Sequence, residues 1–404
     1  MEVRHGYKQT EVAVIPEEWR VETIQQLLDQ EFILGHLDGN HGELYPRSHE
    51  FKSHGVPYIG ANDFANGGVT FDRCKFLAPE RARQFRKGVA MDGDVLFAHN
   101  ATVGPVALLR INEPIVILST TATYFRCDLH KLNNSYLKAA LQSQYFVRQY
   151  QAVMAQSTRF QVPITTQRKL SLVIAPLPEQ HAIAATLSDM DALLNELDRL
   201  IDKKRDLKQA AMRQLLTGQI RLPGFHGEWE VKRLGEIAHI KTGSRNNEDK
   251  VEDGQYPFYV RSEVIERINS YSHDCEAILV PGEGRIGSIF HYINGRFDVH
   301  QRVYAITQFN LGISARFVHT FMAMHFGAWA MQNTVKATVD SLRLPTFKSF
   351  EMRMPPTKDE QTAIVAVLSD IDADLSVLEA RRDKTRALKQ GMMQELLTGR
   401  TRLV

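Results

Sequence analysis

The chain has 404 residues, of which 43% are hydrophobic and 24% are charged, a mixture that excludes wholesale disorder and suits two or three globular domains. The formal net charge is +2 and the mean hydropathy is −0.28, and no apolar run is long enough for a transmembrane helix or a secretory leader. Three widely spaced cysteines, Cys74, Cys127 and Cys275, argue against a disulfide framework and against a structural zinc site. We therefore expect a cytoplasmic protein with no membrane partner.

The first domain is predicted to span residues 1–178. It opens with Ile15–Leu28, which contains Trp19, and continues with short β-type runs such as Val56–Ile59 and Gly93–Phe97. Gly, Asn and Asp separate these runs, a pattern typical of twisted sheets with connecting turns. The fold class predicted for the chain is α/β (α+β).

A single long helix is predicted over residues 179–222. Apolar residues recur at alternating spacings of four and three, as in a coiled-coil seam. The seam residues are Ile183, Leu187, Met190, Leu194, Leu197 and Ile201. Pro176 and Pro178 lie upstream, and Gly218 stands where a glycine commonly ends a helix. About 38 residues at ~1.5 Å each give a rod of roughly 57 Å.

The second domain is predicted over residues 223–359 and repeats the frame of the first. Trp229 falls opposite Trp19, and Tyr256–Val260 resembles Val56–Ile59. The segments between these matches differ, as expected of one scaffold that presents two different loop surfaces.

The second helix, predicted over residues 360–404, copies the first. Residues 179–222 align without a gap on residues 360–403, with about 25 of 44 positions identical. The repeated seam residues are Ile364, Leu368, Ile371, Leu375 and Leu378. The chain is thus organised as domain, helix, domain, helix.

The charges of the two helices predict that they pair antiparallel. Acidic residues crowd the first half of each helix and basic residues the second half, so only the antiparallel arrangement sets acid against base. Exposed ion pairs contribute only ~0–1 kcal/mol each, so they select orientation while the seam supplies affinity. The short linker Pro223–Glu228 agrees, because a parallel pair would require the chain to travel back the length of the helix.

Sequence signatures of catalysis are missing. There is no [ND]-P-P-[YF] tetrapeptide of an amino-group methyltransferase and no G-x-x-x-x-G-K-[ST] loop for ATP. Gly282–Gly287 reads G-x-G-x-x-G, but a short strand precedes it and no suitable helix follows. The 15 histidines lack ligand spacing on a convincing helix. We expect no catalytic residue, no metal site and no bound cofactor on this chain.

Three segments of the sequence resemble those of a known family, the specificity (S) subunits of type I DNA restriction-modification systems. They are GYKQTEVAVIPEEW at Gly6–Trp19, PLPEQHAIAATLSDMDALL at Pro176–Leu194, and PPTKDEQTAIVAVLSDIDADL at Pro355–Leu375. LLTG follows in both helices. The resemblance spans essentially the whole chain, and its helix motifs are the most specific part.

The resemblance implies two target recognition domains, each reading one half of a bipartite, asymmetric site in double-stranded DNA. The antiparallel helices, related by pseudo-twofold symmetry, would set the unspecified spacer and dock two modification (methyltransferase) subunits, to which ATP-dependent restriction subunits can add. The chain itself would be noncatalytic. S-adenosylmethionine, ATP and Mg would then be bound by the partner subunits.

Polar and basic loop residues that can enter a groove are the candidate DNA contacts. In the first domain they are Asn62, Asp63, His99, Asn100, Thr102, Ser157, Arg159 and Gln161. In the second they are Arg261, Ser262, Glu263, Glu283, Arg285, His300, Gln301, Arg302, Lys336, Thr338, Asp340, Ser341 and Arg343. For each residue taken alone, a solvated loop side chain is the competing interpretation.

Two other functions compete with a DNA-reading subunit. A coiled-coil scaffold without a DNA role would share the helices, and sequence-selective duplex binding by the assembled complex distinguishes it. A self-sufficient DNA methyltransferase would bind S-adenosylmethionine as an isolated chain, which we expect not to occur.

Overall fold

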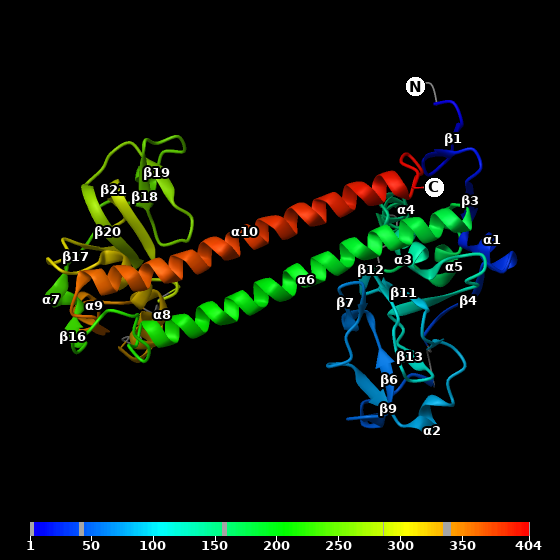
Figure 1. Cartoon of the computed structure of the whole chain (residues 1–404), viewed down its shortest axis with the longest axis horizontal. Coiled ribbons are helices and arrows are strands. Elements are labelled where there is room, and N and C mark those ends of the chain that lie inside the picture. Colours follow the sequence, from blue (N-terminus) through cyan, green and yellow to red (C-terminus); the bar gives the residue numbers. More distant parts are fainter. Residues whose placement is uncertain (1–3, 40–43, 156–159, 286, 334–340, 404) are drawn as a thin grey trace. The chain divides into compact units, whose positions relative to one another are not determined.

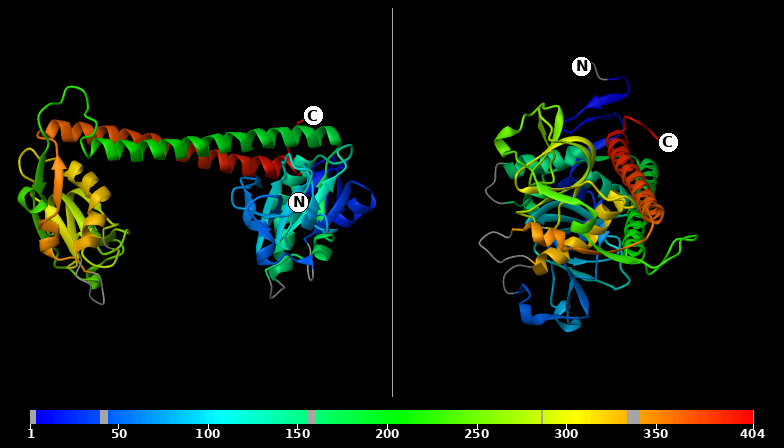
Figure 2. Two further views of the ribbon diagram at one scale, coloured as in Figure 1. Left: turned by 90° about the horizontal axis from the view of Figure 1, so that it is seen from below. Right: turned by 90° about the vertical axis from the view of Figure 1, so that its left-hand side faces the viewer.

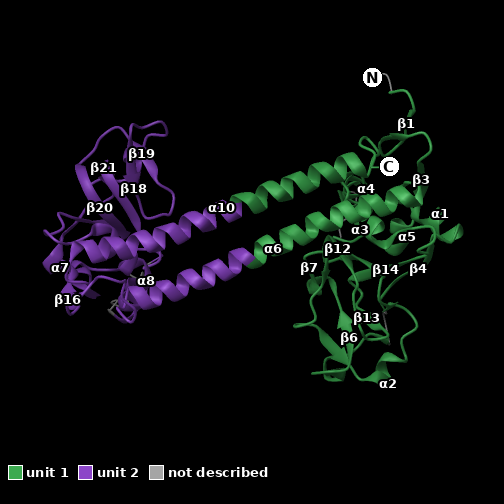
Figure 3. Cartoon of the chain, in the orientation of Figure 1, with its two compact units in different colours: residues 1–199, 380–404 green, residues 200–379 purple. Residues whose placement is uncertain are grey.

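The computed structural model describes residues 4–39, 44–155, 160–285, 287–333 and 341–403, and the chain divides into two compact units. Unit 1 comprises Met1–Arg199 and Ala380–Val404, and unit 2 comprises Leu200–Glu379 (Figure 3). Two 39-residue helices, α6 (Leu177–Leu215) and α10 (Lys358–Leu396), are labelled in Figure 1. Each of them contributes one segment to each unit (Figure 3). Each unit therefore holds a globular part and part of both long helices.

The long helices begin two residues earlier than the sequence predicts, and they end earlier too, at Leu215 rather than residue 222 and at Leu396 rather than residue 404. Helix α6 starts at Leu177, so Pro178 lies in its first turn. Proline is tolerated there because backbone N–H groups in the first turn make no hydrogen bond within the helix. Both helices are followed by the expected left-handed glycines, Gly218 with φ of 71° and Gly399 with φ of 68°.

In each unit the two helix segments run side by side in opposite directions (Figure 2). In unit 1, Ile183 near the start of α6 belongs to the same buried cluster as Met393 and Leu396 at the end of α10. In unit 2, Leu368 near the start of α10 shares a cluster with Leu215 at the end of α6. The predicted antiparallel pairing is confirmed.

Ion pairs cross between the helices as the charge pattern predicts. In unit 2, Lys204 Nζ lies 2.7 Å from Asp374 Oδ2, and Lys208 Nζ lies 2.5 Å from Asp372 Oδ1. In unit 1, Lys389 pairs with the carboxylate of Asp191. The basic second half of one helix thus faces the acidic first half of the other.

Unit 1 contains short strands around α1 (Ile24–Asp29), α2 (Pro79–Ala82), α3 (Asn134–Gln142), α4 (Gln144–Ala155) and α5 (Ile164–Gln167). The strands are β1 (Tyr7–Gln9), β2 (Val14–Pro16), β3 (Arg20–Thr23), β4 (Ile33–Asp38), β5 (Phe51–Lys52), β6 (Val56–Ile59), β7 (Phe64–Ala65), β8 (Gly68–Val69), β9 (Lys75–Leu77), β10 (Val89–Ala90), β11 (Val95–Asn100), β12 (Thr102–Leu108), β13 (Val116–Leu118), β14 (Ala122–Cys127) and β15 (Ser171–Ile174). Their order is β12-β11-β14-β4 in one sheet and β10-β13-β6-β9-β5 in another, with β6 and β13 parallel.

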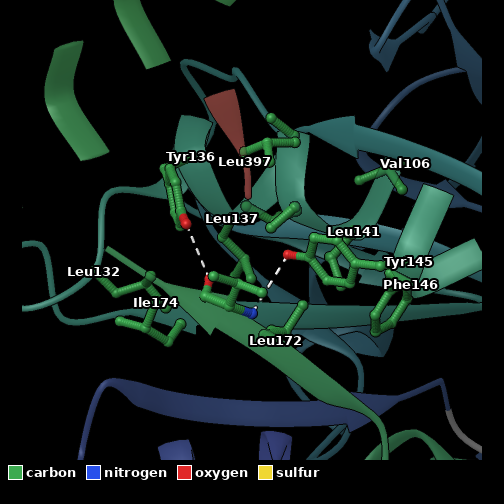
Figure 4. Close-up of a cluster of buried hydrophobic side chains, with 14 of the residues drawn as sticks. Val106, Leu132, Tyr136, Leu137, Leu141, Tyr145, Phe146, Leu172, Ile174 and Leu397 are labelled. Atoms are coloured by element: carbon green, nitrogen blue, oxygen red, sulfur yellow. Dashed lines mark hydrogen bonds between the residues drawn. The ribbon is translucent and has the colours of Figure 1, made fainter. Parts of the chain in front are cut away.

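The core of unit 1 lies where α3 and α4 meet strand β15 and the ends of the long helices (Figure 4). Two buried tyrosines bind the backbone of one strand residue: Tyr136 Oη donates to the carbonyl of Val173 at 2.9 Å, and Tyr145 Oη accepts from its N–H at 3.4 Å. Each phenol thereby satisfies its polar end inside an apolar cluster. These contacts fix strand β15 just before the chain enters α6.

Unit 2 contains α7 (Leu234–Ile237), α8 (Ala315–Asn333) and α9 (Leu344–Lys348). Its strands are β16 (Glu230–Arg233), β17 (His239–Thr242), β18 (Tyr256–Tyr259), β19 (Glu266–Ile268), β20 (His273–Pro281), β21 (His291–Val299), β22 (Val303–Thr307) and β23 (Glu351–Met354). Six of them form a sheet in the order β17-β22-β20-β21-β18-β19, and β16 pairs with β23.

The two units share a topology. The order β21-β20-β22-β17 in unit 2 matches β12-β11-β14-β4 in unit 1, and β18 lies parallel to β21 as β6 lies parallel to β13. The nine-residue β21 pairs with both β20 and β18, whereas in unit 1 the equivalent pairings are made by two separate strands, β12 and β13. Unit 2 therefore has one sheet where unit 1 has two. The predicted α/β (α+β) class with twisted sheets is confirmed. No helix in the described ranges carries an apolar stretch long enough to cross a bilayer.

Candidate nucleic-acid interface

In unit 1, three loops meet around a surface hollow of about 470 Å³, here called hollow 1. The loops follow β6, β11 and β13, and they contribute Gly60–Asp63, Ala101–Thr102, and Ser119 with Thr121. The loops after β6 and β13 are held to one another, because the N–H of Ala61 donates to Thr121 Oγ1 at 2.9 Å and the N–H of Ser119 donates to the carbonyl of Ile59 at 2.7 Å. The scaffold therefore presents a fixed rim of small polar groups.

Hollow 1 also carries positive charge and a buried phenol. Arg73 and Lys75 line it and are exposed. Tyr58 also lines the hollow but is buried, its hydroxyl has no hydrogen-bond partner among the described residues, and desolvation raises its pKa. Exposed cations beside polar groups suit an anionic or polar ligand.

Of the contacts predicted in unit 1, Asn62 and Thr102 are exposed on the rim of hollow 1. Asp63 also lines the hollow, but its carboxylate accepts from the N–H of Gly60 at 2.8 Å and so shapes the turn. His99 is buried, with 5% of its surface exposed. Ser157 and Arg159 lie outside the described residues.

The remaining two contacts predicted in unit 1 pair with each other. Asn100 and Gln161 form an isolated antiparallel bridge, and the N–H of Val162 donates to the carbonyl of His99 at 2.8 Å. The segment before α5 is thereby joined to the end of β11, beside hollow 1.

Unit 2 builds a second hollow, of about 360 Å³, at the same place in its sheet, here called hollow 2. The loops after β18 and β20 line it, contributing Val260–Ser262 and Glu283–Gly284, together with Asn247 and Glu266. An isolated bridge joins Glu283 to Ser341, as Asn100 joins Gln161 in unit 1. The loops predicted from the two halves of the sequence therefore converge in the same way in both units.

The arginines predicted around hollow 2 are paired with carboxylates. Glu283 lies 3.4 Å from Arg261 and 3.1 Å from Arg302, and Arg285 lies 3.0 Å from Glu263. All three arginine side chains are at least half exposed, so the pairs lie at the surface. Such exposed pairs exchange readily for contacts with another polar surface.

The other contacts predicted in unit 2 are divided between surface and interior. Gln301 and Arg343 are exposed, whereas His300 is buried and its Nδ1 accepts from the N–H of Arg302 at 3.0 Å. Burial, with the nearby charges of Arg261 and Arg302, lowers the pKa of His300 and keeps the ring neutral. Lys336, Thr338 and Asp340 lie outside the described residues.

A loop that sequence reasoning missed borders hollow 2. Arg245, Asn246 and Asn247 follow β17, Asn247 lines the hollow, and the Asn246 side chain binds that of Gln301. The signal available in the sequence was an Arg-Asn-Asn run that follows a short strand, a glycine and a serine. Only the convergence with the loop after β21 marks it as part of the same surface.

The described residues contain no group of three or more His, Cys, Asp or Glu side chains placed to hold a metal ion.

The predicted helix seam lies in the paired long helices, away from both hollows. Its buried members are Ile183, Leu187, Leu197, Ile201, Ile364, Leu368 and Leu375, and its partly buried members are Met190, Leu194, Ile371 and Leu378.

Comparison with known proteins points to one family. A family model described as "Type I restriction modification DNA specificity domain" matches residues 16–205 and again residues 226–385. Each match includes one globular domain and most of the helix that follows it.

Individual relatives carry consistent names. The chain is 27% identical over 179 residues to the type I restriction enzyme EcoDI specificity subunit of Escherichia coli, covering 42% of this chain but only 37% of that subunit. It is 21% identical over 437 residues to the putative type I restriction enzyme MjaX specificity subunit of Methanocaldococcus jannaschii, covering 98% and 97% of the two chains.

Solved structures share the fold. The type I restriction-modification S subunit from M. genitalium matches with a TM-score of 0.60 and 16% identity over 98% of both chains. The HsdS subunit from Thermoanaerobacter tengcongensis matches with a TM-score of 0.51 and 16% identity, over 96% of this chain and 98% of that chain.

Proposed function

The chain belongs to the family of type I restriction-modification DNA specificity domains, and from this we propose that it reads a bipartite, asymmetric sequence in double-stranded DNA, one half with each unit. As a specificity subunit it is a noncatalytic component. Adenine methylation and ATP-dependent restriction would be carried out by partner subunits, which would bind S-adenosylmethionine, ATP and Mg. The complex would act in the cytoplasm.

The observation that carries this proposal is the repeated hollow. Equivalent loops meet at equivalent strand ends in both units, yet their linings differ. Hollow 1 offers Arg73, Lys75 and hydroxyl groups, whereas hollow 2 offers Glu283 flanked by two arginines. Because donors and acceptors on loops select base edges, two different linings on one scaffold favour two different half-sites.

The long helices would set the spacer between the half-sites and dock two modification subunits. The seam residues of each long helix pack against the other long helix. Helix α6 also exposes leucines at seven-residue intervals: Leu193, Leu200 and Leu207. The exposed fraction of these side chains is 39%, 47% and 54%. Large apolar side chains repeated along one helix face are suited to covering by another helix.

The test is co-expression of this chain with the modification subunit of its own system, followed by mapping of methylated adenines. We expect one bipartite motif with a fixed spacer. Asn62→Ala should alter only one half of the motif and Ser262→Ala only the other, because the two residues line different hollows. Methylation without a sequence motif would overturn the proposal.

The competing functions make different predictions. A self-sufficient methyltransferase would bind S-adenosylmethionine as an isolated chain, and calorimetric titration of that chain tests this. A scaffold without a DNA role would leave duplex binding by the assembled complex independent of sequence. We expect neither result.

A further inference from the structure

Unit 2 holds a fully buried carboxylate at the edge of its reading surface. Asp298 has 0% of its surface exposed, and it accepts from Ser272 Oγ at 2.7 Å, Ser270 Oγ at 2.8 Å and the N–H of Val299 at 3.0 Å. The fourth donor is Arg245 Nε, at 3.2 Å. Burial alone would raise the pKa of Asp298, but the hydrogen bonds outweigh burial and lower it, so the group is a buried anion.

The fold does not require this anion. In unit 2 Asp298 pairs with Phe258 across two parallel strands, and in unit 1 the residue pairing with Tyr58 at the same register is Ile117, which is also fully buried. The shared scaffold therefore accepts an apolar side chain at this position. A buried charge costs stability unless every lone pair is matched, so its presence in unit 2 alone calls for a purpose other than packing.

Asp298 binds one edge of the Arg245 guanidinium and leaves the terminal nitrogens without a partner among the described residues. The carboxylate occupies Nε, 41% of the arginine side chain is exposed, and no described residue accepts from its two terminal Nη groups. The backbone is fixed as well: the N–H of Arg245 donates to the carbonyl of Val299 at 3.3 Å, and its carbonyl accepts from the N–H of Gln301 at 2.8 Å. The result is a forked donor held in place before any ligand arrives.

Arg245 differs in this respect from the arginines that the sequence singled out. Arg261, Arg285 and Arg302 each have a carboxylate at the terminal nitrogens of the guanidinium. The terminal nitrogens of these three arginines would have to break an ion pair to bind a base, whereas those of Arg245 would not. Its loop borders hollow 2, since Asn247 lines that hollow.

We propose that Arg245 reads a guanine in the half-site recognised by unit 2, and that Asp298 is its positioning residue. A planar fork matches the O6 and N7 acceptors that guanine presents in the major groove, and no other base presents this pair. Anchoring Nε aims the fork and removes the need to order a long side chain on binding. This inference rests on the proposed function, because it requires that the chain reads DNA.

The test compares the methylated motif of the wild-type complex with the motifs of complexes carrying Arg245→Lys or Asp298→Asn. Lysine keeps the charge without the fork, and asparagine releases the anchor. We expect both to tolerate other bases at one guanine of one half-site, so that discrimination of roughly 5- to 150-fold in the wild type is reduced in each variant. The matched control is Arg296→Lys, which alters an exposed arginine paired with Asp274 at 2.9 Å and should leave the motif unchanged.

A second measurement does not depend on how the variants fold. Replacing that guanine by 7-deazaguanine removes N7 from a duplex carrying the mapped site. It should weaken binding by the wild-type complex, and unchanged binding by that complex would contradict the inference. The inference is overturned by an unchanged motif, by relaxation at a base other than guanine, or by equal loss of affinity for all duplexes with a smaller salt dependence, which marks a phosphate contact. Those outcomes leave the proposed function standing, whereas a wild-type complex without any motif removes both.

Discussion

Glu179 and Arg402, 223 residues apart in the sequence, form a two-pronged ion pair in unit 1. Arg402 Nε donates to Glu179 Oε2 and Nη2 donates to Oε1, both at 2.5 Å. The same carboxylate accepts from the indole N–H of Trp19 at 3.1 Å. The first turn of α6, the start of the first domain and the residues after α10 are thereby joined at one buried carboxylate.

Unit 2 repeats this arrangement. Arg221 donates from Nε and Nη2 to the two oxygens of Glu360 at 2.9 Å and 2.6 Å, and the indole of Trp229 donates to Oε1 at 3.3 Å. In both units an arginine six residues after the end of one long helix binds a glutamate in the first turn of the other. The pair therefore locks the antiparallel register at each end.

The Glu179–Arg402 pair should be energetically coupled. Because Glu179 is 5% exposed, removing Arg402 leaves a buried carboxylate with less compensation. A double-mutant cycle with Glu179→Ala and Arg402→Ala, read by chemical unfolding, should give about 1–3 kcal/mol. The exposed Glu196–Arg199 pair on α6 is the control, and its cycle should give less than about 0.5 kcal/mol. Equal coupling in the two cycles would contradict the prediction.

Two leucines of α6 should respond differently to truncation. Leu187 is 3% exposed within the core of unit 1, so Leu187→Ala should lower the free energy of unfolding by about 2–5 kcal/mol. Leu207 is 54% exposed, so Leu207→Ala should change it by less than about 0.5 kcal/mol while weakening binding of the modification subunit. Chemical unfolding and pull-down of the co-expressed subunit measure the two effects. Unimpaired docking of Leu207→Ala would argue against α6 as the docking face.

Acid should destabilise unit 1 through His36. The ring is buried, bonds Gln167 Oε1 at 3.0 Å, and has its pKa lowered by desolvation to about 4 from 6.5. Below pH 6.5 the unfolded chain takes up a proton that the folded chain does not, so stability falls as the pH drops from 6.5 toward 4. The loss from this group between pH 7 and pH 5 should be about 2 kcal/mol.

The His36→Gln variant tests this, because glutamine can still donate to Gln167 but does not titrate. It should be less stable at pH 7 yet lose about 2 kcal/mol less on acidification, as measured by chemical unfolding at both pH values. The exposed His130→Gln variant is the control and should follow the wild type. An unchanged pH dependence in His36→Gln would show that the pKa of His36 is the same in the folded and the unfolded chain.

Lengthening both helices together should lengthen the DNA spacer. Lys204 faces Asp374 and Arg205 faces Glu379, so seven-residue insertions after Arg199 and after Glu379 keep the flanking ion pairs in register. Seven residues add ~10 Å of helix, which corresponds to about three base pairs. Methylation mapping should return the same two half-sites with a longer gap. A folded variant that retains the original gap would separate helix length from spacer length.

The order of domains and helices could be predicted from the sequence alone. The gapless repeat, the seam spacing that includes Leu187, and the terminal Gly218 all depend on residues close together in the chain, where helix geometry dictates which side chains share a face. Opposite charges such as those of Lys204 and Asp374 then sufficed to orient the pair. The frame match between Trp19 and Trp229 proved to be a shared hydrogen bond to the first turn of a long helix.

The surface around the two hollows was predictable only in part. Loops such as those of Asn62 and Arg261 were recognisable because polar residues follow β-type runs, and both line the hollows. Whether a strand-end residue faces water or the core depends on register, and a shift of one residue exchanges the two faces. For that reason His99 and His300 looked like surface residues in the sequence but are buried.

What the sequence determined by itself is the repeat, the two helices and their opposite directions, since each follows from local spacing and charge. The tertiary structure decided which distant groups meet. Asp298 lies 53 residues from Arg245, and the parallel bridge between Arg245 and His300, directly after β21, brings the guanidinium to the carboxylate. Such a contact depends on how several strands pair with one another, and no pattern of neighbouring residues in the sequence specifies all of these pairings.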